Sequence, residues 1–375
     1  MKIVYCIDSM GVYGGIERVT ALKANALSKM PGNEVWILCL KGGDNSVYYL
    51  ESSIMIIDIG VSYNTNKKGL AAIFGLLKGK REHKARISEL LSKISPDIVV
   101  STNKLEKTFL PSITGTWKTV REIHEVKNSR MKSSHGFINK VLAWFLMLYD
   151  SRIVCRKYDC LVLLSETIKK AEWGDFDNTV VIPNPVSFQG LRSSLASSRV
   201  IAIGRLSEEK NFSALIRAFR IVANRFPQWS LDIWGDGDQK GLLSRLILDL
   251  GLSENVHLCG ITSDTERVLS TASLLALSST YESFGLVIAE AMSCGLPVVS
   301  FDCPYGPRSI IDDGIDGFLV PDGDEGSLAE KICVLIKDEG LRKKMGTRAL
   351  VKSRQYDIER ISDLWMSLFE ELTSA

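Results

Sequence analysis

The sequence predicts an α/β protein made of two doubly wound, Rossmann-like domains. Its 375 residues exceed the roughly 250–300 residues at which a single hydrophobic core stops growing. Short apolar runs typical of buried parallel strands alternate with amphipathic helical stretches along the first half. A Pro- and Ser-rich segment at 183–198 interrupts this alternation, which then begins again. The restart favours a second domain of the same kind.

The first half begins with a strand, a glycine turn and a helix. An apolar run at 2–7 leads into a turn that contains Gly11, Gly14 and Gly15, and a helical pattern follows at 16–30. Further strands are expected at 34–40, 54–59, 97–101, 119–123 and 160–164. Because strands separated by helices form parallel sheets, we expect an N-terminal Rossmann-like domain over residues 1–185.

The second half repeats the pattern. Strands are expected at 199–203, 229–234, 256–259, 274–277 and 297–301, with helices at 211–225, 240–250 and 285–293 among them. We therefore expect a C-terminal Rossmann-like domain over residues 186–355. The amphipathic pattern within 356–375 predicts a last helix, which we expect to pack back across the boundary between the domains.

The composition excludes several classes of protein. With 45% hydrophobic and 24% charged residues, the chain is globular rather than disordered. Its longest apolar run, 141–149, is far shorter than the about 20 residues that span a bilayer. The N-terminus alternates like a strand, unlike a signal peptide, and the eight cysteines contain no C-x-x-C pair that would indicate zinc or a disulfide framework. We therefore expect a cytoplasmic protein.

The segment TYESFGLVIAEAMSCGLPVVS places Glu282 and Glu290 in an E-x7-E spacing. Glu282 is expected where a strand ends, the edge at which doubly wound sheets bind ligands, and Glu290 in the following helix. The N-terminus of that helix, at 284–286, offers free N–H groups to a phosphate. Carboxylates accept hydrogen bonds from sugar or ribose hydroxyls, although the helix dipole alone also explains an acid near a helix N-terminus.

The segment GRLSEEKN at 204–211 follows a strand and leads into a helix. Gly204 permits a tight turn, after which Arg205 and Lys210 can direct two cations toward the same edge of the sheet. Two such cations can hold a diphosphate through charge-assisted hydrogen bonds without a metal. The alternative is a charged surface turn, since Glu208 and Glu209 stand between the two cations.

Two D-x-D triplets, at 236–238 and 322–324, raise the question of a metal site. Asp236 and Asp238 lie in a glycine turn after a strand, and Asp324 precedes a helix that it can cap. Turn formation and capping explain these residues, so we expect no metal site.

Basic residues concentrate in the first half of the chain, at 67–93 and 127–157, while acidic residues prevail in the second half. Such patches suit adsorption to anionic lipid headgroups. Solvated helices around one buried face explain them nearly as well. Few aromatic residues interleave with the basic ones, so we expect no nucleic-acid partner.

Four motifs together resemble the retaining GT-B glycosyltransferases of family 4, the group 1 glycosyl transferases. They are GGIER at 14–18, IPNP at 182–185, GRLSEEKN and the E-x7-E segment. Each motif is common singly, but their order and spacing are specific. The resemblance implies a GT-B fold whose two Rossmann-like domains face a central cleft, with the acceptor on the N-terminal domain and the nucleotide-sugar donor on the C-terminal domain.

The resemblance also implies residue roles in the C-terminal domain. Arg205 and Lys210 bind the donor diphosphate, Glu290 accepts ribose hydroxyls, and Glu282 contacts the hydroxyls of the donor sugar. The backbone of Phe284, Gly285 and Leu286 approaches the sugar and phosphate. Ile261 lies near the base.

In the N-terminal domain the resemblance implies that Gly14 and Gly15 close over the donor. His124, just after a strand in REIHEV, falls near the reacting centre and joins Arg205, Lys210 and Glu282 as a catalytic residue. A lone histidine is also often a structural residue. One position departs from the family, since Ser309 stands where many members have a glutamate, so the role of that glutamate is not transferred.

The implied activity is transfer of a hexose or N-acetylhexosamine from a nucleotide diphosphate sugar, a UDP-sugar by analogy, to a saccharide acceptor. The family implies retention at the anomeric carbon, and we expect no metal cofactor. We expect a lipid-linked acceptor, used peripherally at the inner face of the membrane in surface polysaccharide biosynthesis. Two alternatives remain open: a nucleotide-sugar epimerase of the same architecture, and a non-catalytic nucleotide-sugar-binding partner protein.

Overall fold

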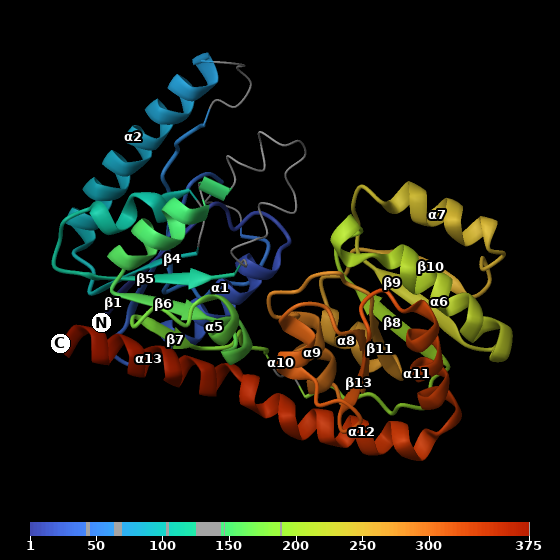
Figure 1. The fold of residues 1–375 in the computed structure, drawn as a ribbon. Helices are drawn as coiled ribbons and strands as arrows, with labels where there is room; N and C mark the ends of the chain where they lie inside the picture. The colour runs from blue at the N-terminus through green and yellow to red at the C-terminus, as the bar shows by residue number, and fades with distance from the viewer. Residues whose placement is uncertain are drawn as a thin grey trace. The chain divides into compact units, whose positions relative to one another are not determined.

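The computed structural model describes residues 1–42, 46–63, 70–102, 105–124, 144–145, 147–187 and 190–374. They form two compact units, which Figure 1 colours along the chain. The first unit comprises Met1–Pro185 together with Ile358–Ala375, and the second comprises Val186–Asp357. The chain therefore returns to the first unit for its last helix.

The first unit is built on a sheet of seven parallel strands in the spatial order β3-β2-β1-β4-β5-β6-β7. Their bounds are β1 Lys2–Ile7, β2 Glu34–Cys39, β3 Met55–Asp58, β4 Ile98–Ser101, β5 Lys118–Ile123, β6 Cys160–Leu163 and β7 Thr179–Val181. Strands β1, β4 and β6 are almost wholly buried, as expected for parallel strands covered on both faces. The strand order reverses between β1 and β4, which marks the ligand-binding edge of a doubly wound sheet.

The described helices of the first unit are α1 Gly15–Ser28, α2 Leu70–Ile94, α5 Glu166–Glu172 and α13 Ile358–Ser374. Helix α13, drawn in red in Figure 1, packs against α1. Its residues Ile361, Trp365, Leu368 and Phe369 recur at helical spacing and are buried in the core that also contains Tyr5. This apolar face explains why the last helix of the chain belongs to the first unit.

The second unit has a sheet of six parallel strands in the order β10-β9-β8-β11-β12-β13. Their bounds are β8 Arg199–Ile203, β9 Ser230–Trp234, β10 Val256–Gly260, β11 Leu274–Leu277, β12 Val298–Phe301 and β13 Gly317–Val320. The order reverses between β8 and β11, so this unit repeats the arrangement of the first. The two sheets confirm the predicted α/β class.

The helices of the second unit are α6 Phe212–Arg225, α7 Lys240–Asp249, α8 Thr265–Ser270, α9 Leu286–Ser293, α10 Gly306–Ile310, α11 Glu325–Lys337 and α12 Glu339–Ser353. Helices α6 and α11 pack together on the sheet. Leu215, Phe219 and Val222 of α6 share one core with Leu328 and Ile332 of α11. This core fixes the strands whose carboxyl ends carry the predicted motifs.

The second unit extends two residues beyond the expected end at 355. The N–H of Val186 donates to the carbonyl oxygen of Tyr356 at 2.8 Å, and Val186 forms a parallel bridge with Asp357. These bonds join the first and last segments of the second unit.

Candidate active site

The predicted motifs of the second unit meet where its strand order reverses. The segment 204–211 leaves the carboxyl end of β8, and the segment 278–285 leaves that of its neighbour β11. Two bonds join the segments: the hydroxyl of Ser278 donates to the carbonyl oxygen of Lys210 at 2.9 Å, and the N–H of Thr280 donates to that of Glu209 at 2.9 Å. Both loops are therefore held at one edge of the sheet.

Lys210 and Glu282 form an ion pair at this edge. The Nζ of Lys210 lies 2.5 Å from Oε1 of Glu282, and that oxygen also accepts a hydrogen bond from the hydroxyl of Ser279 at 2.8 Å. Glu282 is buried, and Lys210 is partly buried. The structure thus brings together Lys210, which is predicted to bind the donor diphosphate, and Glu282, which is predicted to contact the donor sugar.

Close backbone packing shapes the loop that carries Arg205. A Cβ on Gly235 would lie 1.9 Å from the carbonyl oxygen of Gly204, and Gly235 has a φ of 143°. The N–H of Leu206 donates to the carbonyl oxygen of Asp236 at 3.0 Å. Only glycine fits at 235. The turn after β9 thus packs directly against the loop that carries Arg205. Arg205 is exposed and makes no ion pair with any described residue.

The N-terminus of α9 lies next to this pair in the chain. Gly285 caps the helix with a φ of 85°, a left-handed conformation that favours glycine, and Leu286 is the first helical residue. Phe284 is buried, with its ring edge-to-face with Tyr356 at 5.5 Å. The free N–H groups of the first turn can bind a phosphate. Glu290, within the same helix, is buried.

A strained turn after β12 abuts Glu282. Tyr305 has a φ of 76°, which is uncommon for a residue with a side chain. The N–H of Gly306 donates to the carbonyl oxygen of Glu282 at 2.9 Å, and a Cβ on Gly306 would lie 2.7 Å from that of Glu282. Backbone strain of this kind clusters at ligand sites. The sequence of this segment resembles the glycine-proline turn of the family, with Ser309 in place of the usual glutamate. The hydroxyl of Ser309 donates to the carbonyl oxygen of Gly306 at 2.7 Å.

Ile261 directly follows β10 and is 59% exposed. Its strand is joined to the β9 turn, because the N–H of Gly235 donates to the carbonyl oxygen of Gly260 at 2.7 Å. The side chain is free of the core and can contact a flat apolar group such as a base.

The predicted residues of the first unit follow the carboxyl ends of β1 and β5, which lie at the same edge of its parallel sheet. Gly14 caps α1, and both its N–H and its carbonyl oxygen bond to the hydroxyl of Tyr48, at 3.2 and 3.1 Å. A Cβ on Gly15 would meet nothing within 4 Å, so space is open at the helix start. Tyr48 was not found by the sequence analysis, because no motif marks it.

His124 follows β5, and its Nε2 lies 3.0 Å from Oε2 of Glu122. The other carboxylate oxygen, Oε1, pairs with the Nζ of Lys23 in α1 at 2.5 Å. Burial by itself raises the pKa of the Glu122 carboxyl, but the Lys23 charge and the His124 hydrogen bond outweigh it and lower the pKa to about 2. His124 is predictable from the sequence, but its supporting residues Glu122 and Lys23 are not.

The D-x-D triplets have structural partners. Oδ1 of Asp236 accepts a hydrogen bond from the N–H of Gly237 at 3.0 Å and lies 3.5 Å from the Nζ of Lys240. Asp324 caps α11, as predicted, by accepting from the N–H of Ser327 at 2.9 Å. Within the described residues, no three His, Cys, Asp or Glu side chains gather as metal ligands.

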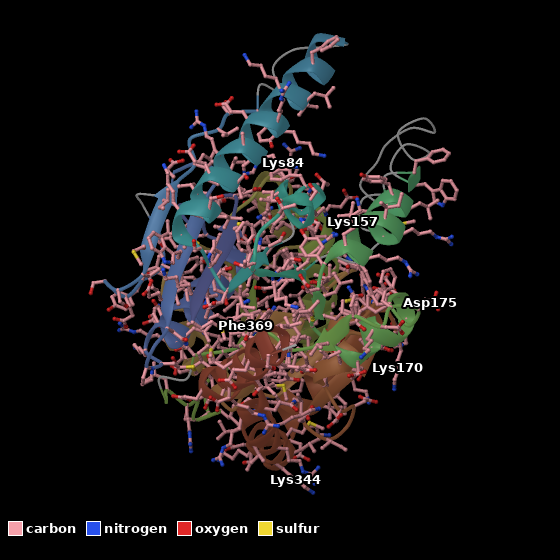
Figure 2. The ribbon with its side chains drawn as sticks, turned by 90° about the vertical axis from the view of Figure 1, so that its left-hand side faces the viewer. Lys84, Lys157, Lys170, Asp175, Lys344 and Phe369 are labelled. Carbon is pink, nitrogen blue, oxygen red and sulfur yellow. The ribbon has the colours of Figure 1, made fainter. Side chains whose placement is uncertain are left out.

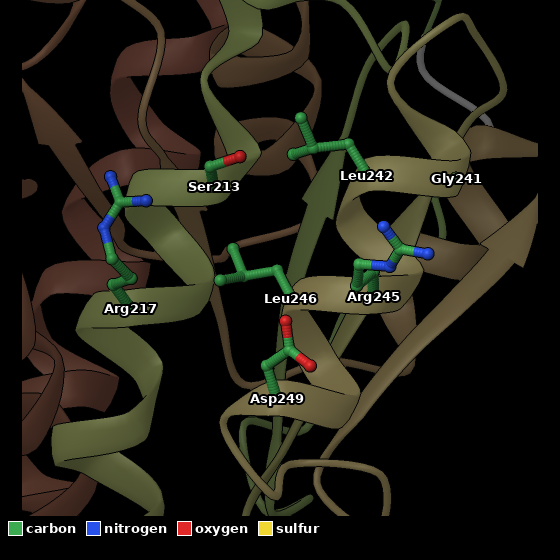
Figure 3. A pocket seen from close by; sticks show the side chains of 7 residues that line it. All are labelled: Ser213, Arg217, Gly241, Leu242, Arg245, Leu246 and Asp249. Carbon is green, nitrogen blue, oxygen red and sulfur yellow. The ribbon is translucent and has the colours of Figure 1, made fainter.

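A hollow of about 630 Å³ lies elsewhere on the second unit, between α6 and α7. Figure 3 shows its lining, which includes Arg217, Arg245 and Leu246. Arg217 is engaged by Glu325 at 2.6 Å. None of the residues predicted to bind a donor lines this hollow, so we place the candidate active site at the sheet edge instead.

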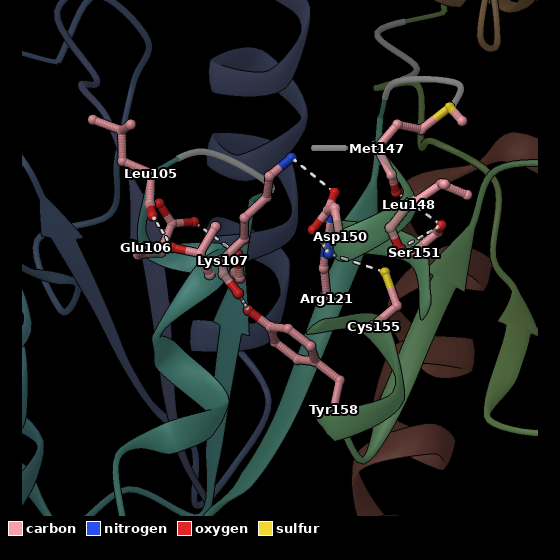
Figure 4. Close-up of polar contacts among 12 residues, drawn as sticks. Leu105, Glu106, Lys107, Arg121, Met147, Leu148, Asp150, Ser151, Cys155 and Tyr158 are labelled. Carbon is pink, nitrogen blue, oxygen red and sulfur yellow. Dashed lines mark hydrogen bonds and ion pairs between the residues drawn. The ribbon is translucent and has the colours of Figure 1, made fainter. Parts of the chain in front are cut away.

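A polar cluster in the first unit includes residues from the described end of the second basic stretch (Figure 4). Arg121 of β5 forms a two-pronged ion pair with Asp150, at 2.8 and 2.7 Å, and Lys107 lies 3.5 Å from the same carboxylate. The hydroxyl of Tyr158 donates to the carbonyl oxygen of Lys107 at 2.9 Å. These contacts anchor the segment from Asp150 onward to the sheet.

The described parts of the two basic stretches carry exposed apolar side chains beside the charges. Figure 2 marks Lys84 in the first stretch and Lys157 in the second. Exposed large apolar residues are Phe74, Leu76 and Leu77 in α2 and Trp144, Phe145, Tyr149 and Ile153 in the second stretch. Residues 67–69, 127–143 and 146 of these stretches lie outside the described part.

No helix in the described ranges has both the length and the apolar character needed to cross a bilayer.

Comparison with known proteins identifies relatives along the whole chain. Residues 187–351 match the family model of the glycosyl transferases group 1. An uncharacterized glycosyltransferase of Haemophilus influenzae is 25% identical over 371 residues, which cover 98% of this chain and 99% of that protein. A poly(glycerol-phosphate) alpha-glucosyltransferase of Bacillus subtilis is 32% identical over 167 residues, but these cover 44% of this chain and 25% of that protein.

Among solved structures, HepE of Anabaena in complex with UDP and glucose is similar over both units. The TM-score is 0.75 at 19% sequence identity, covering 98% of this chain and 99% of that one. At this identity the likeness establishes the fold. Together with the two parallel sheets, it confirms the predicted two-domain GT-B fold.

Proposed function

We propose that this chain, whose residues 187–351 belong to the group 1 glycosyl transferases, is a retaining family 4 glycosyltransferase that uses a UDP-sugar. It moves a hexose or N-acetylhexosamine to a saccharide acceptor. The observation that carries the proposal is the Lys210–Glu282 pair at the switch point of the second sheet. A nucleotide sugar needs a cation for its diphosphate directly beside a carboxylate for its sugar, because the anomeric carbon is bonded to the terminal phosphate.

In this proposal, charge stabilisation drives the chemical step. Departure of the nucleotide diphosphate develops negative charge, which Arg205, Lys210 and the N-terminus of α9 stabilise. Glu282 is held in place by Lys210 and Ser279. Its carboxylate accepts hydrogen bonds from hydroxyls of the donor sugar. The leaving phosphate takes the acceptor proton on the same face of the sugar, so the anomeric configuration is retained.

The remaining donor contacts follow from position in the fold. Glu290, in α9, accepts hydrogen bonds from the ribose hydroxyls. The exposed Ile261 contacts the base. The backbone at 284–286, turned by Gly285, approaches the sugar and phosphate. Gly14 and Gly15 contact the donor, and His124 acts near the reacting carbon. No metal is required, because the two cations and the helix N-terminus supply the positive charge.

Two comparisons support the donor and the stereochemistry. The similar structure of HepE contains UDP and glucose. The Bacillus subtilis relative is an alpha-glucosyltransferase, and a UDP-hexose of the gluco series carries its sugar in alpha linkage. An alpha product from an alpha donor corresponds to retention.

For the acceptor we propose a lipid-linked saccharide used at the cytoplasmic face of an anionic membrane, in surface polysaccharide assembly. Basic side chains such as Arg81 and Arg152 stand among exposed apolar ones such as Phe74 and Ile153. A surface of this mixed kind binds anionic headgroups by charge and inserts its apolar side chains at the interface.

The rival functions predict different products. An epimerase would isomerise the sugar nucleotide in the absence of any acceptor, and a binding partner protein would release no UDP at all. The presence of both cations and both glutamates disfavours the non-catalytic alternative.

The proposal is tested by product analysis. A thermal-shift screen against UDP-, GDP- and ADP-sugars first selects the donor that raises the melting temperature. That donor is then incubated with and without saccharide acceptors, and the products are analysed by NMR. We expect UDP release that depends on acceptor, with the anomeric configuration of the donor preserved. An inverted product, or an isomerised sugar nucleotide from donor alone, would contradict the proposal.

A further inference from the structure

We propose that Glu122 is a positioning residue for His124, and that Lys23 and helix α13 hold Glu122 in place. This inference rests on the proposed role of His124 in sugar transfer. It assigns a function to the buried ion pair of Lys23 and Glu122, neither of which is proposed to contact the donor.

The three side chains form a line from the core of the first unit to the end of β5. Alternate residues of a strand point to the same face, so Glu122 and His124 lie on one side of the sheet. His124 Nε2 lies 3.0 Å from Glu122 Oε2, and Glu122 Oε1 lies 2.5 Å from the Nζ of Lys23. One carboxylate oxygen of Glu122 therefore contacts His124, and the other contacts Lys23.

Stability alone does not explain why the ion pair of Lys23 and Glu122 is buried. The side chains of Lys23 and Glu122 are 1% and 2% exposed, and Trp365 and Tyr5, which lie beside Lys23, belong to the hydrophobic core of the first unit. Replacing such a pair by apolar residues of similar volume is often neutral or stabilising, because burial removes the hydration of both charges. A role for the charge toward a neighbouring group accounts for its presence.

Lys23 is itself fixed by aromatic rings from two other elements. Its Nζ lies 4.4 Å from the ring centroid of Trp365 in α13 and 5.4 Å from that of Tyr5 in β1. Burial lowers the pKa of Lys23, and its interaction with Glu122 opposes that shift. The last helix of the chain thus reaches the predicted catalytic histidine through Lys23 and Glu122.

The carboxylate defines the orientation and tautomer of the ring. A proton on Nε2 is required for the hydrogen bond to Glu122, which leaves Nδ1 as the acceptor. No described residue bonds to Nδ1, and our proposal assigns that nitrogen to a hydroxyl of the substrate. Groups that orient a catalytic histidine in this way are positioning residues, because they act through the ring and do not touch the substrate.

The test removes both charges at once, since Lys23→Met alone would leave Glu122 buried and unpaired. We compare the parent with Lys23→Met/Glu122→Met, which cannot bond the imidazole, and Lys23→Met/Glu122→Gln, whose amide oxygen can. We expect the Met pair to lower kcat about 10- to 100-fold at an unchanged donor KM, and the Gln pair to recover most of the loss. His124→Ala should cost no further rate in the Met-pair background, because the groups act as a unit.

A readout independent of activity separates this inference from the proposed function. The chain has four histidines, so selective ¹⁵N-histidine labelling with His124→Ala as the assignment control identifies the His124 signals. We expect the Nε2-protonated tautomer in the parent and the Gln pair, and a mixture in the Met pair. An unchanged tautomer in the Met pair overturns the inference whatever the activity. If His124→Ala instead transfers sugar at the parent rate, the catalytic role of His124 fails, and the positioning inference fails with it.

Discussion

Lys210 and Glu282 lie 72 positions apart in the sequence, and their side chains meet at 2.5 Å. The pair ties the loop that leaves β8 to the loop that leaves β11, at the edge where the strand order reverses. The sequence motifs alone predict that both side chains contact a sugar-diphosphate donor. Their proximity links the two assignments into one site.

Removal of the Glu290 carboxylate should weaken donor binding with little effect on the chemical step. A ribose contact is made equally in the bound donor and in the transition state, so Glu290→Ala should mainly raise the donor KM. Steady-state kinetics at varied donor concentration measures this. Because Glu290 is buried in α9, thermal melting of the variant must first show that it is folded. A large fall in kcat at an unchanged KM would exclude a simple ribose contact.

Sugar transfer should not depend on a divalent metal. Two cations and a helix N-terminus are proposed to balance the diphosphate, and Asp236 and Asp324 of the two D-x-D triplets are engaged in a turn contact and a cap contact. Rates measured with EDTA and with added magnesium or manganese should agree. Abolition by EDTA with rescue by either metal would refute metal independence.

Adsorption to vesicles should increase with anionic lipid and decrease with salt, because screening weakens charge attraction over about 10 Å at 0.1 M. Liposome sedimentation of Lys78→Glu/Arg81→Glu, two exposed positions on α2, should show weaker binding than the parent. The matched control is Lys344→Glu/Arg348→Glu, which reverses the same number of exposed charges on α12 of the second unit. Equal binding to neutral and anionic vesicles would contradict a charge-driven surface.

The first unit should lose stability in acid through Glu122. Its pKa is lowered from 4.5 to about 2 in the folded protein, so its stabilising contribution is full above the unfolded value and is lost as pH falls from about 4.5 toward 2. The melting temperature of the parent should therefore fall more steeply over this range than that of Lys23→Met/Glu122→Gln. Parallel curves would show that the pair does not control acid stability.

The strands were predictable because each is a short apolar run bounded by polar or glycine residues. The run at 199–203 corresponds to β8 and that at 274–277 to β11, with identical bounds. Strand β7 was missed because it has only three residues, and β13 was missed because it begins at Gly317, a residue that weakens a strand pattern. Helix α12 was missed because its sequence is largely polar and it buries Arg342, whose guanidinium donates to carbonyl oxygens of the core.

The site was predictable only where a motif marks it. The segments around Lys210 and Glu282 have recognisable spacing, and the doubly wound order brings their strands together. The glycine-proline turn after Tyr305 is visible in the sequence, but the positive φ of Tyr305 and the hydroxyl contact of Tyr48 are not, because they depend on tertiary packing. Lys23 is also hidden, since a lysine in an amphipathic helix normally indicates a solvated face.

The turnover of Lys210→Ala under saturating donor tests the central claim most directly. If Lys210 stabilises the departing diphosphate, its charge matters more in the transition state than in the bound donor, so kcat should fall about 10²- to 10³-fold while donor affinity changes less. Because Glu282 loses its partner in this variant, Lys210→Ala/Glu282→Gln serves as the folding control and should be at least as slow. A folded Lys210→Ala protein that transfers sugar at nearly the parent rate would contradict the account.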